Sequence, residues 1–274
     1  MYFYKRLLGW LDGGDNVNNE EYLKEKTKFY FIEKGKNMES AKVFTDNENY
    51  VVCQSAPGVQ VWLWTKDNLS LEKLKELKDV LLNNYVTNDK LTFTSKKEVY
   101  DYLLSTKDNY SLDEYFKMGT LKCLKPVKPN ECDAYLDHLH KDDYDTAANY
   151  YYLAQNEMNV DSSHLTMEYA YEHVKNWLDN EKFWVLRNKN GKMVSVVCYD
   201  TFDNLAKLGN VYTPVEERRK GYCANLVYYV TNMLLNNGYV PMLYTDYNYV
   251  NSNAAYKKVG YEDTGYLVNY TLKK

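Results

Sequence analysis

The hydrophobic and polar positions of the first 118 residues follow a pattern that predicts a mixed α/β unit. Five elements are expected in it: strands at 50–54 and 59–64, a helix at 71–81, a strand at 91–94 and a helix beginning at residue 95. A Ser-Ala-Pro-Gly turn separates the first two strands and predicts a hairpin. The apolar residues of the first helix recur at three- and four-residue spacing behind Ser70, which suits an N-cap.

The pattern from residue 121 onwards predicts a second unit that is richer in strands. Strands are expected at 121–124, 183–186, 193–199, 205–213, 242–245 and 266–272, and helices at 131–139, 166–178, 222–236 and 254–259. The third of these helices has Gly238 just beyond its end, which is typical of a helix C-cap. Because helices alternate with strands, the fold class is α/β or α+β, with domains expected at 1–118 and 119–274.

Composition and charge exclude several classes of protein. The chain has 274 residues, and its net charge of −4 gives no electrostatic footprint for nucleic acid. No apolar run approaches the roughly 18 residues of a membrane span, and residues 1–10 do not have the pattern of a signal peptide. The five cysteines are odd in number and widely spaced, so a reducing cytoplasm is expected. The pattern does not indicate an oligomeric state.

The segment at 211–227 carries the clearest chemical signal. A β-rich run enters it and an amphipathic helix leaves it, and between them lie Arg218, Arg219, Lys220 and Gly221. A helix N-terminus presents free backbone N–H groups and a partial positive charge, so it suits a phosphate group. A glycine there allows the phosphate to approach the backbone closely. The alternative is that three exposed cations merely flank a surface turn.

Two motifs in order decide between these interpretations. Arg218-x-x-Gly221-x-Cys223 resembles the Arg/Gln-x-x-Gly-x-Gly/Ala motif of the GNAT superfamily of N-acetyltransferases. The downstream segment with Asn253, Tyr256, Gly260 and Tyr261 resembles the Asn-x-x-Tyr-x-x-x-Gly-Tyr/Phe segment of the same family. The resemblance covers roughly residues 119–274. It implies a mixed, mostly antiparallel central sheet flanked by helices. We expect the smaller α/β domain before it to be a degenerate GNAT-like half.

The resemblance also implies the roles of individual residues. Backbone amides of a pyrophosphate loop would hold acetyl-CoA, and a splayed strand would pair with pantetheine. Tyr256 would protonate the leaving thiolate, and an amine would attack the thioester directly. The expected cofactor-binding residues are Val211, Tyr212, Thr213, Arg218, Arg219, Lys220, Gly221, Tyr222, Cys223, Ala224, Asn253 and Tyr256.

The chain departs from the family pattern at two positions. Cys223 stands where the motif prefers glycine or alanine, and it is either an inert small residue or a redox-sensitive thiol. Lys207 stands where some members carry a glutamate base, and a protonated lysine cannot accept a proton. Asp200 or Asp203 could replace that base, water could mediate the transfer, or the amine could arrive neutral.

An acidic segment with two histidines offers further candidates. His138 and Asp142, four residues apart on the predicted helix, could share a metal ion, but two ligands do not make a site, so no metal is expected. Asp142 and Asp143 could instead attract a cationic acceptor.

The sequence therefore predicts an acetyl-CoA-dependent N-acetyltransferase. Its acceptor would be a small amine or a peptide, and neither a nucleic acid nor a membrane is expected as a partner. The alternative is a non-catalytic acyl-CoA-binding sensor or interaction module. A third interpretation keeps the fold and changes the donor to a longer acyl-CoA.

Overall fold

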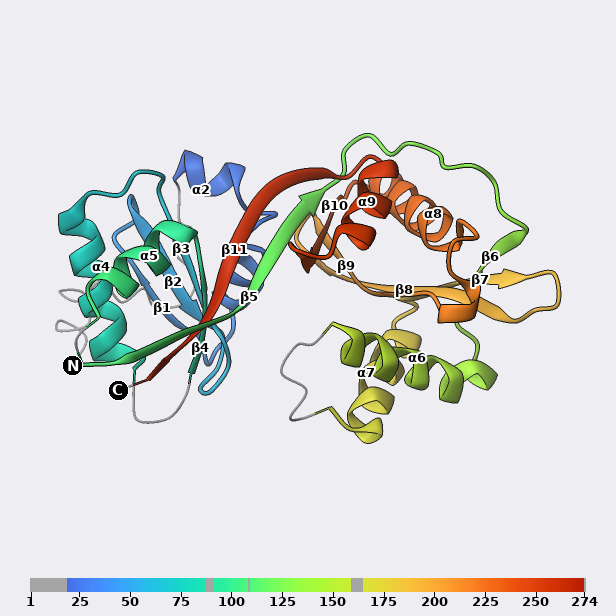
Figure 1. Cartoon of the computed structure of the whole chain (residues 1–274), viewed down its shortest axis with the longest axis horizontal. Coiled ribbons are helices and arrows are strands. Elements are labelled where there is room, and N and C mark those ends of the chain that lie inside the picture. The colour runs from blue at the N-terminus through green and yellow to red at the C-terminus, as the bar shows by residue number, and fades with distance from the viewer. Residues whose placement is uncertain (1–18, 87–90, 108, 159–164, 274) are drawn as a thin grey trace. The chain divides into compact units, whose positions relative to one another are not determined.

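The computed structural model describes residues 19–86, 91–107, 109–158 and 165–273 of the chain (Figure 1). The chain forms two compact units. Unit 1 comprises Met1–Met118 together with Gly265–Lys274, and unit 2 comprises Gly119–Thr264. The last ten residues, which the sequence pattern grouped with the second domain, thus belong to unit 1.

Unit 1 is a sheet with helices, built as the hydrophobic pattern indicates. Its helices are α2 (Glu20–Lys24), α3 (Tyr30–Gly35), α4 (Leu71–Asn84) and α5 (Lys97–Ser105). Its strands are β1 (Lys42–Thr45), β2 (Tyr50–Gln54), β3 (Val61–Thr65), β4 (Leu91–Ser95) and parts of β5 (Ser111–Lys122) and β11 (Glu262–Lys273). The strands run in the order β1-β2-β3-β4-β11. β3 and β4 are parallel, and the other neighbours are antiparallel.

The N-terminus of α4 is capped by the side chain of Ser70. The Ser70 hydroxyl accepts a hydrogen bond from the Lys73 backbone N–H at 3.3 Å, which confirms Ser70 as the N-cap. Leu74, Leu77 and Leu81 are buried on the face that packs on the sheet. The helix therefore forms where the spacing of its leucines predicts it.

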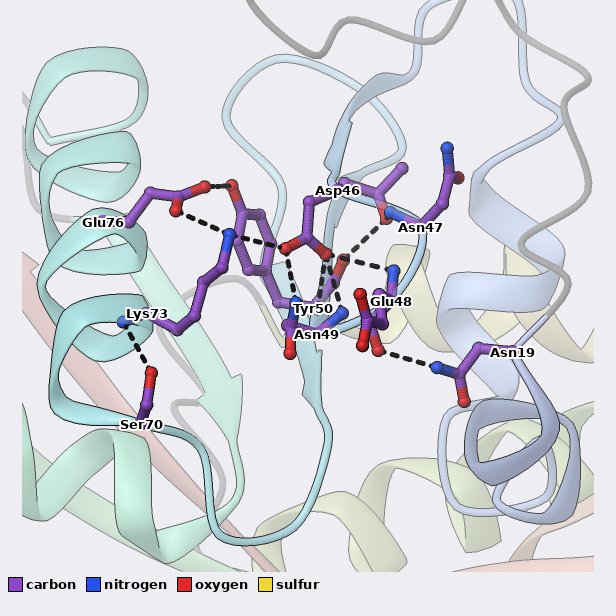
Figure 2. A network of polar contacts seen from close by, with 10 residues as sticks. Asn19, Asp46, Asn47, Glu48, Asn49, Tyr50, Ser70, Lys73 and Glu76 are labelled. Carbon is purple, nitrogen blue, oxygen red and sulfur yellow. Dashed lines mark hydrogen bonds and ion pairs between the residues drawn. The ribbon is translucent and has the colours of Figure 1, made fainter.

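A polar network joins the β1–β2 turn to α4 (Figure 2). One oxygen of Asp46 accepts hydrogen bonds from the backbone N–H groups of Glu48, Asn49 and Tyr50, at 3.1, 2.7 and 3.3 Å. The other oxygen lies 3.0 Å from the Lys73 ammonium. Burial alone would raise the pKa of Asp46. The hydrogen bonds from Asn49 and Lys73 outweigh it and lower the pKa to about 2 from its ordinary value of 3.8.

We expect Asp46→Asn to lower the free energy of unfolding at pH 7 by about 2 kcal/mol, since each pKa unit is worth about 1.4 kcal/mol. A depressed carboxyl pKa stabilises the fold above the unfolded-state value and ceases to do so as the pH falls through the folded-state value. The difference between variant and wild type should therefore shrink between about pH 4 and pH 2. Urea unfolding at several pH values measures it. Asp79→Asn, at an exposed position within α4, is the control. Equal stability of Asp46→Asn and wild type at pH 7 would contradict the prediction.

Unit 2 contains the larger part of the strands. They are the end of β5, then β6 (Ala134–His138), β7 (Phe183–Asn188), β8 (Met193–Phe202), β9 (Leu205–Tyr212), β10 (Val240–Asp246) and the start of β11. Its helices are η1 (Lys141–Asp143), α6 (Tyr144–Glu157), α7 (Met167–Asp179), η2 (Val215–Glu217), α8 (Tyr222–Asn236) and α9 (Val250–Lys258). The strands run in the order β5-β10-β9-β8-β7-β6. The pairs β6–β7, β7–β8 and β8–β9 are antiparallel, and the pair β9–β10 is parallel.

Two hydrophobic clusters cover the two faces of the unit 2 sheet. One contains Leu226, Val230 and Leu234 of α8 with Tyr256 and Val259 at α9. The other joins α6 and α7 to β7 and β8. Accordingly, α8 and α9 lie on one side of β8 and β9, and α6 and α7 lie on the other (Figure 1).

The helix predicted at 131–139 is wrong, because this segment forms the edge strand β6. Ala134 and Leu136 alternate with polar positions and pack against the α8 cluster, which is the period of a strand. The buried Arg187 holds β6 in place. Its guanidinium donates to Asp137 at 2.6 Å and to Asp143 at 2.5 Å. Asp143 thus has a structural partner, in contrast to the acceptor attraction expected from its charge.

Candidate active site

The site is set up where β9 and β10 part. Their parallel register begins at Leu205 opposite Val240 and ends at Leu208 opposite Leu243. Residues 209–212 continue β9 along β8 alone, and Tyr212 pairs there with Val196. The backbone of β9 beyond Leu208 therefore has an edge without a β10 ladder, as the family resemblance implies for the strand at 205–213.

A bulge lies in this splayed part of β9. The register passes from Cys198 opposite Gly209 to Val196 opposite Tyr212, so β9 carries one residue more than β8. Asn210 has a positive φ of 48°, and both polar atoms of its side-chain amide are buried without a partner among the described residues. Leaving such a group unpaired costs about 1–3 kcal/mol. Sequence reasoning missed Asn210, although a Gly-Asn pair within a strand is a bulge signal.

The start of α8 presents an uncapped row of amides. The helix begins at Tyr222 after Gly221, whose φ is 82°, and no side chain caps it. In the described part of the chain, the backbone N–H groups of 219–224 donate to no acceptor. The first such bond is from Asn225 N–H to the Gly221 carbonyl at 3.1 Å. Gly221 and Arg219 (φ 64°) both take the left-handed conformation that bends the loop over the helix end.

The three cations of the loop have different surroundings. Arg218 donates to the Thr213 carbonyl at 2.9 Å, and both oxygens of Glu157 in α6 lie 2.7 Å from it. Lys220 pairs with Glu217 at 2.7 Å. Arg219 is exposed and pairs with no carboxylate of the described residues. The structure thus uses the Arg218 side chain to fix the loop to β9 and α6, and leaves the Arg219 side chain exposed.

Tyr256 of α9 packs in the core beside Cys223, the second residue of α8. Tyr256 is 8% exposed, and burial raises its pKa well above the ordinary value, with the nearby Cys223 adding to the effect. The phenol is therefore protonated at neutral pH and can donate a proton. Burial also raises the pKa of the Cys223 thiol to about 11, which keeps it protonated and favours its inert interpretation.

Asn253 ties α9 to the end of β10. Its side-chain N–H₂ donates to the carbonyls of Asp246 and Tyr247 at 3.0 and 3.1 Å. Its side-chain oxygen is buried and accepts no hydrogen bond from the described residues. The structure therefore leaves one acceptor available beside the splayed strands.

The other expected site residues lie around the splay. Ser195 donates to the Tyr212 carbonyl at 3.2 Å and lies 2.9 Å from the Thr213 hydroxyl. Val211, Tyr222 and Ala224 pack in or against the α8 cluster. These residues hold the strand and the helix start in position, so their contribution to ligand binding rests on their backbone.

Other candidates fall outside this arrangement. His138 stacks on Trp184, with ring centroids 3.7 Å apart, and lies on a strand. The described residues contain no group of three histidine, cysteine or acidic side chains placed to hold a metal ion. No helix that the structure describes is both long and apolar enough to cross a membrane.

Comparisons with known proteins agree with this geometry. Residues 139–261 match the model of the acetyltransferase (GNAT) family. No curated protein matches the chain. A solved GNAT-family acetyltransferase from Colwellia psychrerythraea has 13% sequence identity and a TM-score of 0.58, with 95% of this chain and 98% of that chain covered. A GCN5-related N-acetyltransferase from Kribbella flavida has 13% identity and a TM-score of 0.54, with 93% and 96% covered.

The splayed sheet, the uncapped helix start and the family match define the class of protein. The chain carries a GNAT acetyltransferase domain at residues 139–261. This confirms the family resemblance and the mixed α/β fold class expected from the sequence. The match of residues 139–261 to this family implies acyl transfer from an acyl-CoA.

Substitution of the two neighbouring arginines, Arg218 and Arg219, should change the melting temperature Tm by different amounts. We expect Arg218→Gln to lower Tm by about 2–4 °C, because it loses hydrogen bonds to Thr213 and Glu157 that are worth about 1 kcal/mol at this half-exposed position. Arg219→Gln should change Tm by no more than about 1 °C, as an exposed residue outside any network. Differential scanning calorimetry measures both. Equal effects would contradict the assigned role of Arg218.

Proposed function

We propose that the protein is an acetyl-CoA-dependent N-acetyltransferase that acts by direct attack of a primary amine. The observation that carries the proposal is the row of unbonded amides at 219–224 beside a splayed β9. Pyrophosphate oxygens would accept hydrogen bonds from these amides and the partial charge of α8 would favour them. The amide groups of pantetheine would pair with the free edge of β9, and one of them would satisfy the buried Asn210.

The chemistry then follows from the position of Tyr256. The amine nitrogen attacks the thioester carbonyl carbon, a backbone N–H of the splayed β9 stabilises the developing oxyanion, and the C–S bond breaks as the amide forms. Tyr256 gives its proton to the leaving thiolate, and the proton released by the amine passes through water to restore the Tyr256 phenol. Burial keeps the Tyr256 phenol protonated near neutral pH, so its proton is present when the thiolate forms.

Unit 1 is proposed to be a degenerate GNAT-like half. Its order β1-β2-β3-α4-β4-α5-β5 repeats the order β7-β8-β9-α8-β10-α9-β11 of the C-terminal half. In each half the strands before and after the longest helix are parallel. The difference lies at the helix start, since Ser70 caps α4 while α8 is uncapped. A capped helix offers fewer free amides, so phosphate binding is assigned to unit 2 alone.

The binding proposal is tested by titration calorimetry with acetyl-CoA. Wild type should bind with micromolar Kd, about −8 kcal/mol, and Gly221→Glu should abolish binding because it places a carboxylate in the anion site. Gly238→Glu is the matched control. Gly238 has the same φ of 82° at the other end of α8, with open space around it, so it carries equal backbone strain without touching the site. Loss of binding in both variants would contradict a pyrophosphate site at the amides of 219–224.

Catalysis is tested by Tyr256→Phe in an assay of thiol release. We expect kcat to fall by about 10–100-fold, because the leaving thiolate loses its proton donor, while the Kd for acetyl-CoA stays unchanged. Tyr261→Phe is the control, since its ring lies 6.1 Å from Tyr256 and its hydroxyl is bonded to Thr231. An unchanged kcat in Tyr256→Phe would exclude this donor.

The alternative is a non-catalytic acyl-CoA-binding module. It is favoured by Lys207, which replaces the glutamate that some family members use as a base. If the wild-type protein binds acetyl-CoA but releases no thiol with any amine, the result supports the non-catalytic binding module.

A further inference from the structure

A pair of opposite charges lies on the sheet face opposite α8, next to the bulge of β9. Asp200 of β8 is directly opposite Lys207 of β9 in the register. Cys198, two residues before Asp200, packs among α6 and α7, so Asp200 lies on that same face by the alternation of a strand. Ala206 and Leu208 face α8, which puts Lys207 and Gly209 on the side of Asp200.

The two charged groups are offset along the sheet. The Lys207 ammonium lies 3.4 Å from the position that a Cβ on Gly209 would take. It therefore extends over Gly209, towards the bulge at Asn210, whereas the Cα of Asp200 lies opposite the Cα of Lys207. The absence of a side chain at Gly209 provides the space for the ammonium.

An aromatic strip leads to the carboxylate. Tyr169, His173 and Trp177 recur every four residues on one face of α7, with ring centroids 4.0 and 6.0 Å apart. The Trp177 indole N–H donates to one oxygen of Asp200 at 3.4 Å. Tyr151 of α6 covers one side of all three rings, with ring centroids 5.6–6.4 Å away. Tyr169, at the far end of the strip, is 40% exposed. The other oxygen of Asp200 accepts no hydrogen bond from the described residues.

Resting on the proposed N-acetyltransferase function, we propose that the acceptor is a free α-amino acid with an apolar or aromatic side chain. Asp200 receives its ammonium group, which loses one proton to water before the nitrogen attacks the thioester, Lys207 receives its carboxylate, and the aromatic strip packs its side chain. The ammonium and carboxylate of an α-amino acid are about one hydrogen bond apart. One α-amino acid can therefore contact both side chains, with a charge-assisted hydrogen bond at each end. A lysine ammonium has three N–H donors, so it serves a carboxylate alongside its contacts within the fold.

This arrangement disfavours polycationic amines and the peptide acceptor that the sequence left open. A polycationic amine, such as an aminoglycoside, would place a second positive charge against Lys207. A peptide N-terminus has an amide where the amino acid has its carboxylate, so Lys207 would gain no ion pair. Like charges brought together in a half-buried site are penalised, and opposite charges are rewarded.

The test compares acceptors that differ by one group, at saturating acetyl-CoA and with thiol release as the readout. L-phenylalanine carries both charges, and phenethylamine lacks the carboxylate. Wild type should use L-phenylalanine with kcat/KM at least tenfold above phenethylamine. Lys207→Met should remove this preference by lowering only the value for L-phenylalanine. Asp200→Asn should raise KM for both at least tenfold. Lys182→Met is the control, because Lys182 lies nearby on Thr201 and outside the proposed site.

The outcomes separate the acceptor from the reaction. Equal use of both compounds, or a Lys207→Met variant that affects both equally, overturns the amino-acid acceptor and leaves the acetyltransferase function standing. Thiol release with other amines but not with L-phenylalanine, L-leucine or L-tryptophan does the same. Failure of wild type to bind acetyl-CoA in calorimetry overturns the proposed function, and the acceptor with it.

Discussion

The end of the parallel ladder between β9 and β10 is the constraint on which the candidate site depends. Up to Leu208 and Leu243 the two strands satisfy each other's backbone groups, and beyond them β9 follows β8 alone. Backbone groups that leave a ladder need other partners. The bulge at Asn210 adds a buried amide with the same need. A ligand that carries its own amides, as pantetheine does, answers both requirements at once.

Helices α4 and α8 each follow a strand of a parallel pair, and they differ in how their first backbone N–H groups are satisfied. In unit 1 the chain caps α4 with Ser70. In unit 2 the chain enters α8 through Arg219 and Gly221 in the left-handed conformation, and no side chain takes the first amides. Left-handed backbone at a non-glycine residue costs about 1–2 kcal/mol. The leucines and valines of α8 pack the helix without help from this loop conformation. The left-handed backbone therefore fits a loop whose conformation serves anion binding.

The sequence predicted those elements whose signal is local. The helix at α8 followed from apolar residues such as Leu226 and Val230, and the turn into it from Gly221. The segment at 131–139 misled because its leucines are compatible with a helix, while the pairing with β7 and the contacts of Arg187 that make it a strand are distant in sequence. The pairing of β11 with β4 was equally unpredictable, because nothing near Val268 specifies Ser95 as its partner. At the site, the sequence located the loop cations but not their different partners.

Those partners determine how the loop recognises charge. Glu217 is 8% exposed and lies 2.9 Å from Lys192 and 2.7 Å from Lys220, so it already neutralises cations at the helix start. Glu157 does the same for Arg218. Before an anion binds, most of the positive charge that the sequence displays is therefore balanced within the fold. In the proposed function, recognition of phosphate therefore falls mainly on the fixed amides of 219–224 and on Arg219, which need no rearrangement of existing ion pairs. Because fixed amides select by position, and a cluster of mobile lysines would select by charge alone, such a loop favours a pyrophosphate of defined geometry over anions in general.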